Sequence, residues 1–291
     1  MLSVCKIING KKIAEKIKSN LKIEVFNIKR DFGVIPGLAI ILIGDDPASK
    51  IYIKNKQRTC KDIGVSFFKY EFSAGVSEKE VLYLIEKLNQ DRNTHGIIVQ
   101  LPLPKHLNER RIADSVLPEK DVDSFSSKNI GKLSSGFAEL LPCTPAGVVE
   151  LFRCENIEVS GKHAVVIGRS NIVGKPMAMM LLSNDATVTV CHRKSKNIKE
   201  ICRTADIVIS AVGRANFITE DMINVGAVVI DVGINRKDDG KIVGDVDFES
   251  VYKKAKFLTP VPGGVGPMTV AMLMKNTVKA AKLLQLRPIF Y

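Results

Sequence analysis

Long apolar runs are absent from the 291-residue chain, and none approaches the roughly 18–20 residues that cross a bilayer. Residues 1–17 also lack the apolar core and the small-residue cleavage site of a secretion signal. No C-x-x-C pair occurs among the six cysteines, which are Cys5, Cys60, Cys143, Cys154, Cys191 and Cys202. This scatter disfavours both a metal site and a disulfide framework. We therefore expect a protein of the reducing cytoplasm, with no membrane partner and no metal.

A clustered basic arm is also missing, although the net charge is +12, from 43 Lys and Arg against 31 Asp and Glu. A basic surface is compatible with nucleic-acid binding, with an acidic small-molecule ligand or with simple solvation. The lysines are spread over nearly every expected helix, which favours a solvated surface over a polyanion-binding patch. We expect no nucleic-acid partner, while an acidic ligand would still gain from the charge.

The length allows two domains, and the 45% hydrophobic and 25% charged content is typical of a globular protein. In the first half, apolar strands alternate with helical stripes, which predicts a parallel α/β unit. The expected elements are helices over 11–30 and 47–63, strands over 38–43, 65–70 and 96–101, and a helix after the capping box Ser77-x-x-Glu80. Asp46 and Gly64 are the expected caps of the helix over 47–63.

Residues 117–144 have turn residues and little periodicity, which predicts connecting loops. Beyond Pro145 the alternation of strands and helices restarts. The expected elements there are strands over 163–167, 187–191, 207–212 and 227–232, a helix over 176–182, and a last helix from Pro267 to about Leu284.

A glycine-rich turn, Gly168-Arg-Ser-Asn-Ile-Val-Gly174, follows the expected strand over 163–167. Free backbone N–H groups and the positive end of a helix dipole make such a turn a site for pyrophosphate. The turn departs from the dinucleotide fingerprint, because Ser170 stands at the second glycine position and one extra residue precedes Gly174. An ordinary strand-to-helix turn is therefore the alternative.

No acidic residue ends the strand over 187–191, where an NAD enzyme usually holds the ribose hydroxyls with a carboxylate. The residues there are Cys191-His-Arg-Lys-Ser195, whose cations and hydroxyl suit the 2′-phosphate of NADP. A solvent-facing basic loop in a lysine-rich protein is the alternative. We favour NADP as the cofactor.

Tyr52 and Lys56 are four residues apart, so they project from one face of the helix over 47–63 and can act on one small molecule. The common dehydrogenases carry such a pair after their nucleotide loop, whereas here it precedes the glycine-rich turn. We therefore expect an α/β fold of two domains. An N-terminal α/β substrate domain over 1–145 precedes a Rossmann-like, doubly wound dinucleotide domain over 146–267, with a cleft between them. The last helix, within 268–291, is expected to pack back on the first domain.

Polar residues near the Tyr52 and Lys56 face could complete a site. Gln100 is expected at the carboxyl end of its strand, where α/β sheets present ligand-binding groups, and Asp121 and Asp123 follow on a loop. An amine desolvated beside them can have its pKa lowered enough to act as an acid or base. Each residue also has a plain alternative: a solvated lysine, a half-buried core tyrosine, a strand-capping glutamine, and a turn carboxylate paired with Lys120.

Several strings occur along the chain in the order of a known family. They are Asp45-Asp-Pro-Ala-Ser-Lys-Ile-Tyr-Ile-Lys-Asn-Lys56, Val99-Gln-Leu-Pro-Leu-Pro104, Lys120-Asp-Val-Asp123, Pro142-Cys-Thr-Pro145, Gly168-Arg-Ser-Asn-Ile-Val-Gly-Lys-Pro176, Val229-Ile-Asp-Val-Gly-Ile-Asn235 and Thr259-Pro-Val-Pro-Gly-Gly-Val-Gly-Pro-Met-Thr269. Together they resemble the bifunctional methylenetetrahydrofolate dehydrogenase/cyclohydrolase family over nearly the whole chain. One difference is that Ser124-Phe-Ser-Ser127 stands where the family usually has Gly-Phe-His-Pro. If that glycine serves a positive φ, Ser124 adds strain there.

The resemblance implies two reactions of one-carbon metabolism, which supplies purine biosynthesis. NADP⁺ takes a hydride from 5,10-methylenetetrahydrofolate, and water then opens the methenyl product to 10-formyltetrahydrofolate. The implied catalytic residues are Lys56, Gln100, Tyr52 and Asp121, with Lys56 as the acid or base of the hydrolysis. The implied substrate-binding residues are Ser49, Tyr52, Val99, Leu101, Asp121, Pro262, Gly263 and Gly264. The implied cofactor-binding residues are Gly168, Arg169, Ser170, Gly174, Pro176, His192, Arg193, Ser195, Gly213 and Ile234.

The resemblance also implies a homodimer formed through the nucleotide domain, and a folate substrate that carries one or more glutamates. Other hypotheses differ in class. An NADP dehydrogenase of the shikimate type would share the architecture and explain Lys56, but it would not explain Gln100, Asp121 and the loop at 262–266 together. A non-catalytic dinucleotide- or folate-binding protein is a third hypothesis, and a non-specific nucleic-acid binder is the fourth.

Overall fold

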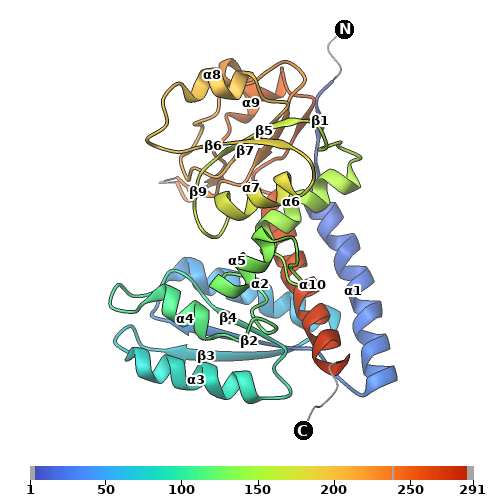
Figure 1. Cartoon of the computed structure of the whole chain (residues 1–291), viewed down its shortest axis with the longest axis vertical. Coiled ribbons are helices and arrows are strands. Elements are labelled where there is room, and N and C mark those ends of the chain that lie inside the picture. Colours follow the sequence, from blue (N-terminus) through green and yellow to red (C-terminus); the bar gives the residue numbers. More distant parts are fainter. Residues whose placement is uncertain (1–3, 238, 287–291) are drawn as a thin grey trace. The chain divides into compact units, whose positions relative to one another are not determined.

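The computed structural model describes residues 4–237 and 239–286, and the chain divides into two compact units (Figure 1). The three-stranded unit comprises residues 15–143 together with the described residues from 270 onward. The six-stranded unit comprises the described residues up to 14 together with 144–269. The end of the predicted C-terminal segment, 287–291, lies outside the described residues. Among the helices that the structure describes, none is both long and apolar enough to cross a membrane.

The three-stranded unit is built on a parallel sheet, whose strands lie in the order β3 (Ser66–Phe72), β2 (Gly37–Ile43) and β4 (Gly96–Val99). All of β2 is buried, as expected for a continuous apolar run in the centre of a parallel sheet. The helices are α1 (Gly10–Phe32), α2 (Pro47–Ile63), α3 (Glu78–Gln90), α4 (Glu109–Ser115), α5 (Ser127–Ser134) and α10 (Val265–Leu286), of which α1 and α10 also contribute residues to the six-stranded unit (Figure 1). Apolar side chains of β2, β4, α3 and α4 form one core.

Local hydrogen bonds set the ends of two predicted helices. Asp46 is the N-cap of α2 and accepts from the Ser49 N–H at 2.7 Å, and Gly64 ends the helix with a φ of 86°. Ser77 and Glu80 form the expected reciprocal capping box of α3. Both predicted boundaries are confirmed, because these caps depend only on residues close together in the sequence.

The six-stranded unit contains a parallel sheet with helices against it (Figure 1). Its strands are, in spatial order, β1 (Lys6–Ile7), β11 (Phe257–Leu258), β8 (Val228–Asp231), β7 (Ile207–Ser210), β5 (His163–Ile167) and β6 (Thr187–Cys191). The remaining elements are α6 (Cys143–Cys154), α7 (Gly174–Leu182), α8 (Ile198–Arg203), η1 (Glu220–Met222), α9 (Phe248–Tyr252) and the hairpin of β9 (Asn235–Arg236) and β10 (Ile242–Val243). The order β8-β7-β5-β6 places the strand before the glycine-rich turn inside the sheet.

Two local predictions are wrong. The segment 117–144 contains α5 and the start of α6, and is therefore not only loops. Helix α5 is too short to show a periodic stripe, and Ser126 begins it by accepting from the Asn129 N–H at 3.4 Å. The strand predicted over 96–101 ends at Val99, although the Gln100 N–H still donates to Ile41 O at 2.9 Å. Pro102 has no N–H with which to continue the ladder.

Candidate active site

Lys56 and Gln100 are joined by a direct hydrogen bond. The half-buried Lys56 Nζ donates to Gln100 Oε1 at 3.0 Å, and Gln100 Nε2 donates to the Leu101 carbonyl at 2.9 Å. The second bond orients the amide, so that its oxygen faces the amine. The structure therefore brings together two of the four predicted catalytic residues. The acceptor of the Lys56 ammonium is the neutral Gln100 amide, and this single bond uses only one of the three N–H donors of the ammonium.

The first turns of α2 place three predicted residues on one helix face. Ser49, Tyr52 and Lys56 are spaced three and four residues apart. Ser49 is buried, and its Oγ donates to the same Leu101 carbonyl at 3.3 Å. Tyr52 has 41% of its surface exposed, so it is not the half-buried core aromatic of the alternative hypothesis. The α2 face thus carries an exposed aromatic ring next to a tethered amine.

Asp121 is buried and occupied by hydrogen bonds from its own loop. It has 5% exposure, and its carboxylate accepts from the Phe125 N–H at 3.3 Å, the Ser126 N–H at 2.9 Å and Asn129 Nδ2 at 2.9 Å. Burial raises the pKa of this carboxyl, and the hydrogen bonds act in the opposite direction. Lys120 does not pair with it and instead donates to the carbonyls of Leu88 and Asp91. These contacts shape the loop and leave Asp121 little access to a ligand.

Asp123 and Lys56 both lie close enough to Cys143 to affect its thiol. Both residues act on the buried thiol of Cys143, whose pKa lies well above its usual range. Burial is the largest cause, the Asp123 carboxylate adds to it through charge and a hydrogen bond, and the Lys56 ammonium opposes it. Asp123 is only partly buried, unlike Asp121. The sequence argument named Asp123 on the same loop but did not include it among the catalytic residues, because two carboxylates two positions apart cannot be ranked without knowing their burial.

Ser124 adopts the positive φ expected at its position. Its φ is 60°, and the residue is fully buried. The Ser124 N–H donates to Asp121 O at 3.0 Å and its Oγ donates to Leu140 O at 2.9 Å. The hydroxyl therefore forms a bond that a glycine could not make, and it links the Asp121 loop to the segment before α6.

The glycine-rich turn has the close backbone approaches that a phosphate-binding turn needs. Gly168 has a φ of 129°, and a Cβ there would come within 2.4 Å of Ala211 O. A Cβ on Gly174 would collide with Gly168 itself. Ser170 Oγ accepts from the N–H groups of Val173 and Gly174 at 3.1 and 3.3 Å, which are donors at the start of α7. Ser170 thus closes the turn on itself, and the positive end of the α7 dipole is what suits an anion there. Arg169 is exposed and Pro176 is buried.

The turn after β6 presents its cations to solvent. Hydrogen bonds close it on itself, since the His192 N–H donates to Ser195 Oγ at 3.0 Å and the Ser195 N–H donates to His192 O at 2.7 Å. Arg193 and Lys194, at the tip, are exposed. This geometry holds two cations at the carboxyl end of the strand next to β5, where they can meet a phosphate.

The remaining predicted residues also lie in the six-stranded unit. Gly213 has a φ of 70° and is exposed, and Ile234 is 49% exposed. Gly263 has a φ of 106°, and its carbonyl accepts from the Lys11 N–H at 2.9 Å. Pro262 and Gly264 flank it. The predicted substrate-binding set is thus divided, because Ser49, Tyr52, Val99, Leu101 and Asp121 belong to the three-stranded unit.

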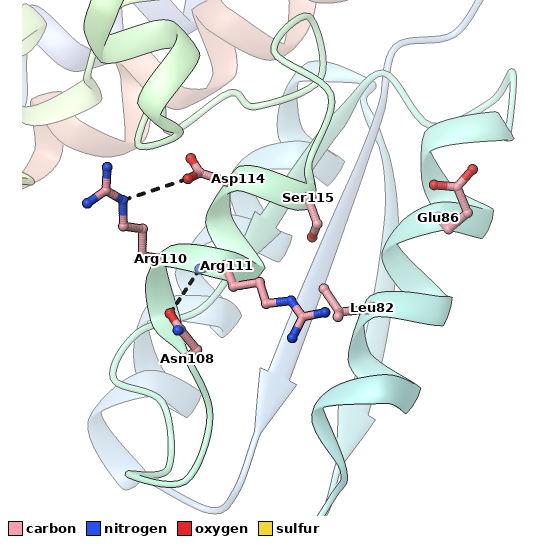
Figure 2. A pocket seen from close by; sticks show the side chains of 7 residues that line it. All are labelled: Leu82, Glu86, Asn108, Arg110, Arg111, Asp114 and Ser115. Atoms are coloured by element: carbon pink, nitrogen blue, oxygen red, sulfur yellow. Dashed lines mark hydrogen bonds and ion pairs between the residues drawn. The ribbon is translucent and has the colours of Figure 1, made fainter.

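A surface pocket between α3 and α4 contains none of the predicted residues (Figure 2). Its lining consists of Leu82, Glu86, Asn108, Arg110, Arg111, Asp114 and Ser115. Arg110 forms an ion pair with Asp114 at 3.9 Å, and Arg111 forms one with Glu78 at 3.1 Å. The charges on its wall are therefore largely balanced.

Comparisons with known proteins match both halves of the chain. Residues 8–123 match the family model described as tetrahydrofolate dehydrogenase/cyclohydrolase, catalytic domain, and residues 142–285 match the NAD(P)-binding domain of the same family. The chain is 54% identical over 278 residues to the bifunctional protein FolD of Acetivibrio thermocellus, covering 96% of this chain and 97% of the relative.

Solved structures agree with these matches. The bifunctional FolD methylenetetrahydrofolate dehydrogenase/cyclohydrolase of Campylobacter jejuni has a TM-score of 0.95 and 48% identity, with 96% of this chain and 99% of that chain covered. The Trypanosoma brucei methylenetetrahydrofolate dehydrogenase-cyclohydrolase, complexed with NADP cofactor and inhibitor, has a TM-score of 0.93 and 38% identity, with 97% and 99% covered.

Proposed function

Because the chain belongs to the tetrahydrofolate dehydrogenase/cyclohydrolase family, we propose that its three-stranded unit carries the folate chemistry and its six-stranded unit binds NADP. The enzyme oxidises 5,10-methylenetetrahydrofolate to the methenyl form with NADP⁺ and hydrolyses that product to 10-formyltetrahydrofolate. The family thereby replaces the shikimate-type and non-catalytic hypotheses. The roles of individual residues, given next, are proposals.

The hydrolysis is assigned to Lys56, and its hydrogen bond with Gln100 carries this proposal. Opening the methenyl bridge requires a proton to leave the attacking water and another to reach the departing nitrogen. The Lys56 amine is the group on the α2 face that can hold and release a proton, and Gln100 Oε1 fixes its direction at 3.0 Å. Gln100 itself does not titrate, so it acts as a positioning residue.

The oxidation needs less from the chain. The carbon that loses hydride is flanked by two nitrogens, so the cation formed is delocalised and no strong base is required. NADP⁺ supplies the hydride acceptor when it is bound. The contribution of the protein is orientation, which can account for a large part of a barrier. The exposed Tyr52 ring is proposed to stack on the aminobenzoyl group of the substrate and to keep it on the α2 face.

The carboxylate that meets the pterin edge is better assigned to Asp123 than to Asp121. A ligand-binding carboxylate needs accessible oxygens for the adjacent N–H and NH₂ donors of the pterin. Asp121 accepts three hydrogen bonds inside its own loop and is 5% exposed, whereas Asp123 is partly exposed and, like Lys56, acts on Cys143. The catalytic and substrate-binding roles first assigned to Asp121 stay predictions, and its burial weighs against them. Ser49, Val99 and Leu101 would line the same face, and Pro262, Gly263 and Gly264 would approach the ligands through their backbone.

The cofactor site is proposed along the carboxyl ends of β5, β6, β7 and β8. The turn of Gly168, Arg169, Ser170 and Gly174, followed by Pro176, would hold the pyrophosphate at the start of α7. His192, Arg193 and Ser195 would hold the 2′-phosphate. Gly213 and Ile234, which follow β7 and β8, would line the part of the cofactor site that lies along those strands. The close approaches at Gly168 and Gly174 and the exposure of Arg193 support this assignment.

The partners beyond folate and NADP are proposals too. We propose a homodimer through β6, because β6 is the edge of its sheet, and Val190 and nearby Leu182 expose 39% and 66% of their surfaces. The carboxylates of glutamates on the folate would be attracted by the net charge of +12 on the protein. All six cysteines are free, which supports the cytoplasm as the proposed location.

One assay tests the proposed order of events. The purified protein is given 5,10-methylenetetrahydrofolate and NADP⁺, and the absorbance of the methenyl product is followed together with that of NADPH. We expect NADPH and 10-formyltetrahydrofolate to form in equal amounts, with only a transient methenyl signal. A methenyl product that accumulates and decays no faster than in buffer would contradict hydrolysis at this site.

A further inference from the structure

A fully buried carboxylate, Asp245, lies where two loops of the six-stranded unit meet. It accepts five hydrogen bonds and is 0% exposed. The donors are Ser210 Oγ at 3.1 Å, Val212 N at 2.7 Å, Gly213 N at 3.2 Å, Arg214 N at 3.0 Å and Asn235 Nδ2 at 2.9 Å. Few buried groups satisfy so many donors, and three of these are consecutive backbone N–H groups.

The donors come from the carboxyl ends of two neighbouring strands. Ser210 is the last residue of β7, residues 212–214 follow directly, and Asn235 follows β8. In open parallel sheets, ligands bind outside these strand ends. The segment 212–216 is exposed and contains a positive φ at Gly213, so burial of its own side chains cannot order it. Three of its N–H groups, those of 212–214, are held by the Asp245 carboxylate, and the Asn216 N–H donates to Gly244 O at 3.4 Å.

A second carboxylate holds Asp245 itself in place. Asp231, the last residue of β8, accepts from the N–H groups of Gly233, Asp245 and Val246, each at 2.9 Å. A Cβ on Gly233 would collide with the Asp245 carboxylate, and a Cβ on Gly244 would collide with that of Asp231. The two carboxylates therefore occupy a closely fitted space, and Asp245 has no room to turn away from its donors.

We propose that Asp245 is a positioning residue of the cofactor site, which holds residues 212–214 and Asn235 in the arrangement that receives NADP. The inference rests on the proposed contacts of Gly213 and Ile234 with the cofactor. A loop ordered before binding does not lose further conformational freedom when the ligand arrives, so its affinity is higher. Asp245 contacts only protein atoms and acts on the cofactor through this loop.

Asp245→Asn tests the proposal with little change in shape. The carboxamide presents an NH₂ group to backbone N–H donors, which leaves some of them unsatisfied and releases the loop. We expect the KM for NADP⁺ to rise about tenfold, with kcat and the KM for the folate substrate changed less than about twofold. In the unliganded protein, the amides of 212–214 should exchange hydrogen faster than in the wild type.

Asp221→Asn is the matched control, because Asp221 is another hydrogen-bonded carboxylate of the same unit. It bonds to Lys199 and Thr219 and holds none of the cofactor loops. This control should lower the Tm while leaving the KM for NADP⁺ unchanged. An Asp245→Asn variant that also lowers only the Tm, with wild-type KM and wild-type exchange at 212–214, would overturn the proposal.

Hydrogen exchange in the wild type separates this inference from its premise. If NADP⁺ slows hydrogen exchange at the amides of 212–214, the segment contacts the cofactor. An unchanged affinity of Asp245→Asn for NADP⁺ would then refute the positioning role of Asp245 and leave the cofactor site itself standing. No protection would refute the cofactor role of Gly213 and the inference with it. If Asp245→Asn does not fold, Asn235→Ala tests the proposal with the same two measurements, because it removes one of the five hydrogen bonds to Asp245. We expect the KM for NADP⁺ to rise about two- to fivefold, on the order of one lost hydrogen bond.

Discussion

Single side chains in this protein act through the partners that hold them. Lys56 lies on an ordinary amphipathic helix, and its bond to Gln100 Oε1 distinguishes it from the other lysines of α2. Asp121 and Asp123 are two positions apart and differ in burial: Asp121 is buried and accepts three hydrogen bonds within its own loop, whereas Asp123 is only partly buried. Residue type therefore limits which side chains can take part in catalysis or binding, and their hydrogen bonds and burial distinguish among those side chains.

Replacing Lys56 by methionine separates the two reactions. Lys56→Met keeps the length of the side chain but removes the titrating amine, so hydrolysis should fall by at least about 100-fold while the oxidation falls much less. The two rates are measured from methenyl decay and from NADPH formation. Lys54→Met is the control, because Lys54 is an exposed lysine on the same helix and should leave both rates near the wild type. Equal loss of both activities in Lys56→Met would refute a proton-transfer role.

Ser124 predicts an unusual order of stabilities. Its φ of 60° favours glycine, while its Oγ bond to Leu140 O favours serine. Ser124→Ala keeps the backbone strain and loses the bond, so we expect a loss of about 2 kcal/mol in the free energy of unfolding. Ser124→Gly relieves the strain and should lose about 1 kcal/mol less than the alanine variant. Urea unfolding is followed by circular dichroism, since the chain has no tryptophan. An alanine variant as stable as the glycine variant would contradict strain at this position.

The proposed cofactor site depends on short elements and turns. The start of α7 supplies the positive end of a helix dipole, and the hydrogen-bonded turn after β6 supplies cations. The helix dipole and the turn geometry are properties of segments, because they need several residues in one arrangement. The edge position of β6 likewise belongs to the strand as a whole and supports the proposed dimer.

The turn after β6 predicts the preference between the two nicotinamide cofactors. Arg193→Gln removes an exposed guanidinium proposed to meet the 2′-phosphate, so the KM for NADP⁺ should rise by about tenfold or more. The KM for NAD⁺, which lacks this phosphate, should change less than about twofold. Lys196→Gln, an exposed cation just beyond the turn, serves as the control for net charge. A ratio of the two KM values that does not change in Arg193→Gln would refute the phosphate contact.

For the whole molecule, one buried carboxylate in the six-stranded unit, Asp231, links stability to pH. Burial, the largest cause, raises the pKa of Asp231 from 3.8 to about 6, with the neighbouring Asp245 adding to it and backbone hydrogen bonds opposing it. The folded state therefore binds a proton more tightly than the unfolded state. The contribution of Asp231 to stability is complete below pH 4 and is lost as the pH rises to about 6.

Asp231→Asn isolates this dependence. The variant cannot ionise at this position, so its free energy of unfolding should lack the component that the wild type loses between pH 4 and pH 6. That component is about 3 kcal/mol for a pKa raised from 3.8 to about 6. The difference between wild type and variant, measured by urea unfolding at several pH values, should therefore be largest near pH 4 and shrink toward pH 6. A difference that is constant or grows over this range would contradict a raised pKa.

The parts of this protein that depend on sequence neighbours were predictable. The caps at Asp46, Gly64 and Ser77 are confirmed because they form within one turn of chain. The apolar runs of β2 and β5 identified buried parallel strands, and the ordered motifs identified the family. The sequence pointed to Ser124 as a place of strain on the condition that the backbone there needs a positive φ, and its φ of 60° meets that condition.

Other features depend on segments far apart in the chain. The pairing of β1 with β11 joins residues near 6 to residues near 257, and no local pattern signals it. The short helix α5 has no periodic apolar stripe, and it is stabilised by its N-cap Ser126 and by the burial of Asn129 and Leu133. Burial separates Asp121 from Asp123, and the five donors of Asp245 come from β7, the loop after it and the start of β9.

The sequence alone therefore determined the fold class, the family and the set of chemical groups, because hydrogen bonds between neighbours and apolar periodicity are written into short stretches of chain. The tertiary structure alone decided which groups are buried, which are paired and which loops are held. Desolvation and long-range hydrogen bonds exist only once distant segments are in contact. For this protein, that step turned a lysine into a positioned amine and a loop aspartate into a candidate for holding the cofactor site.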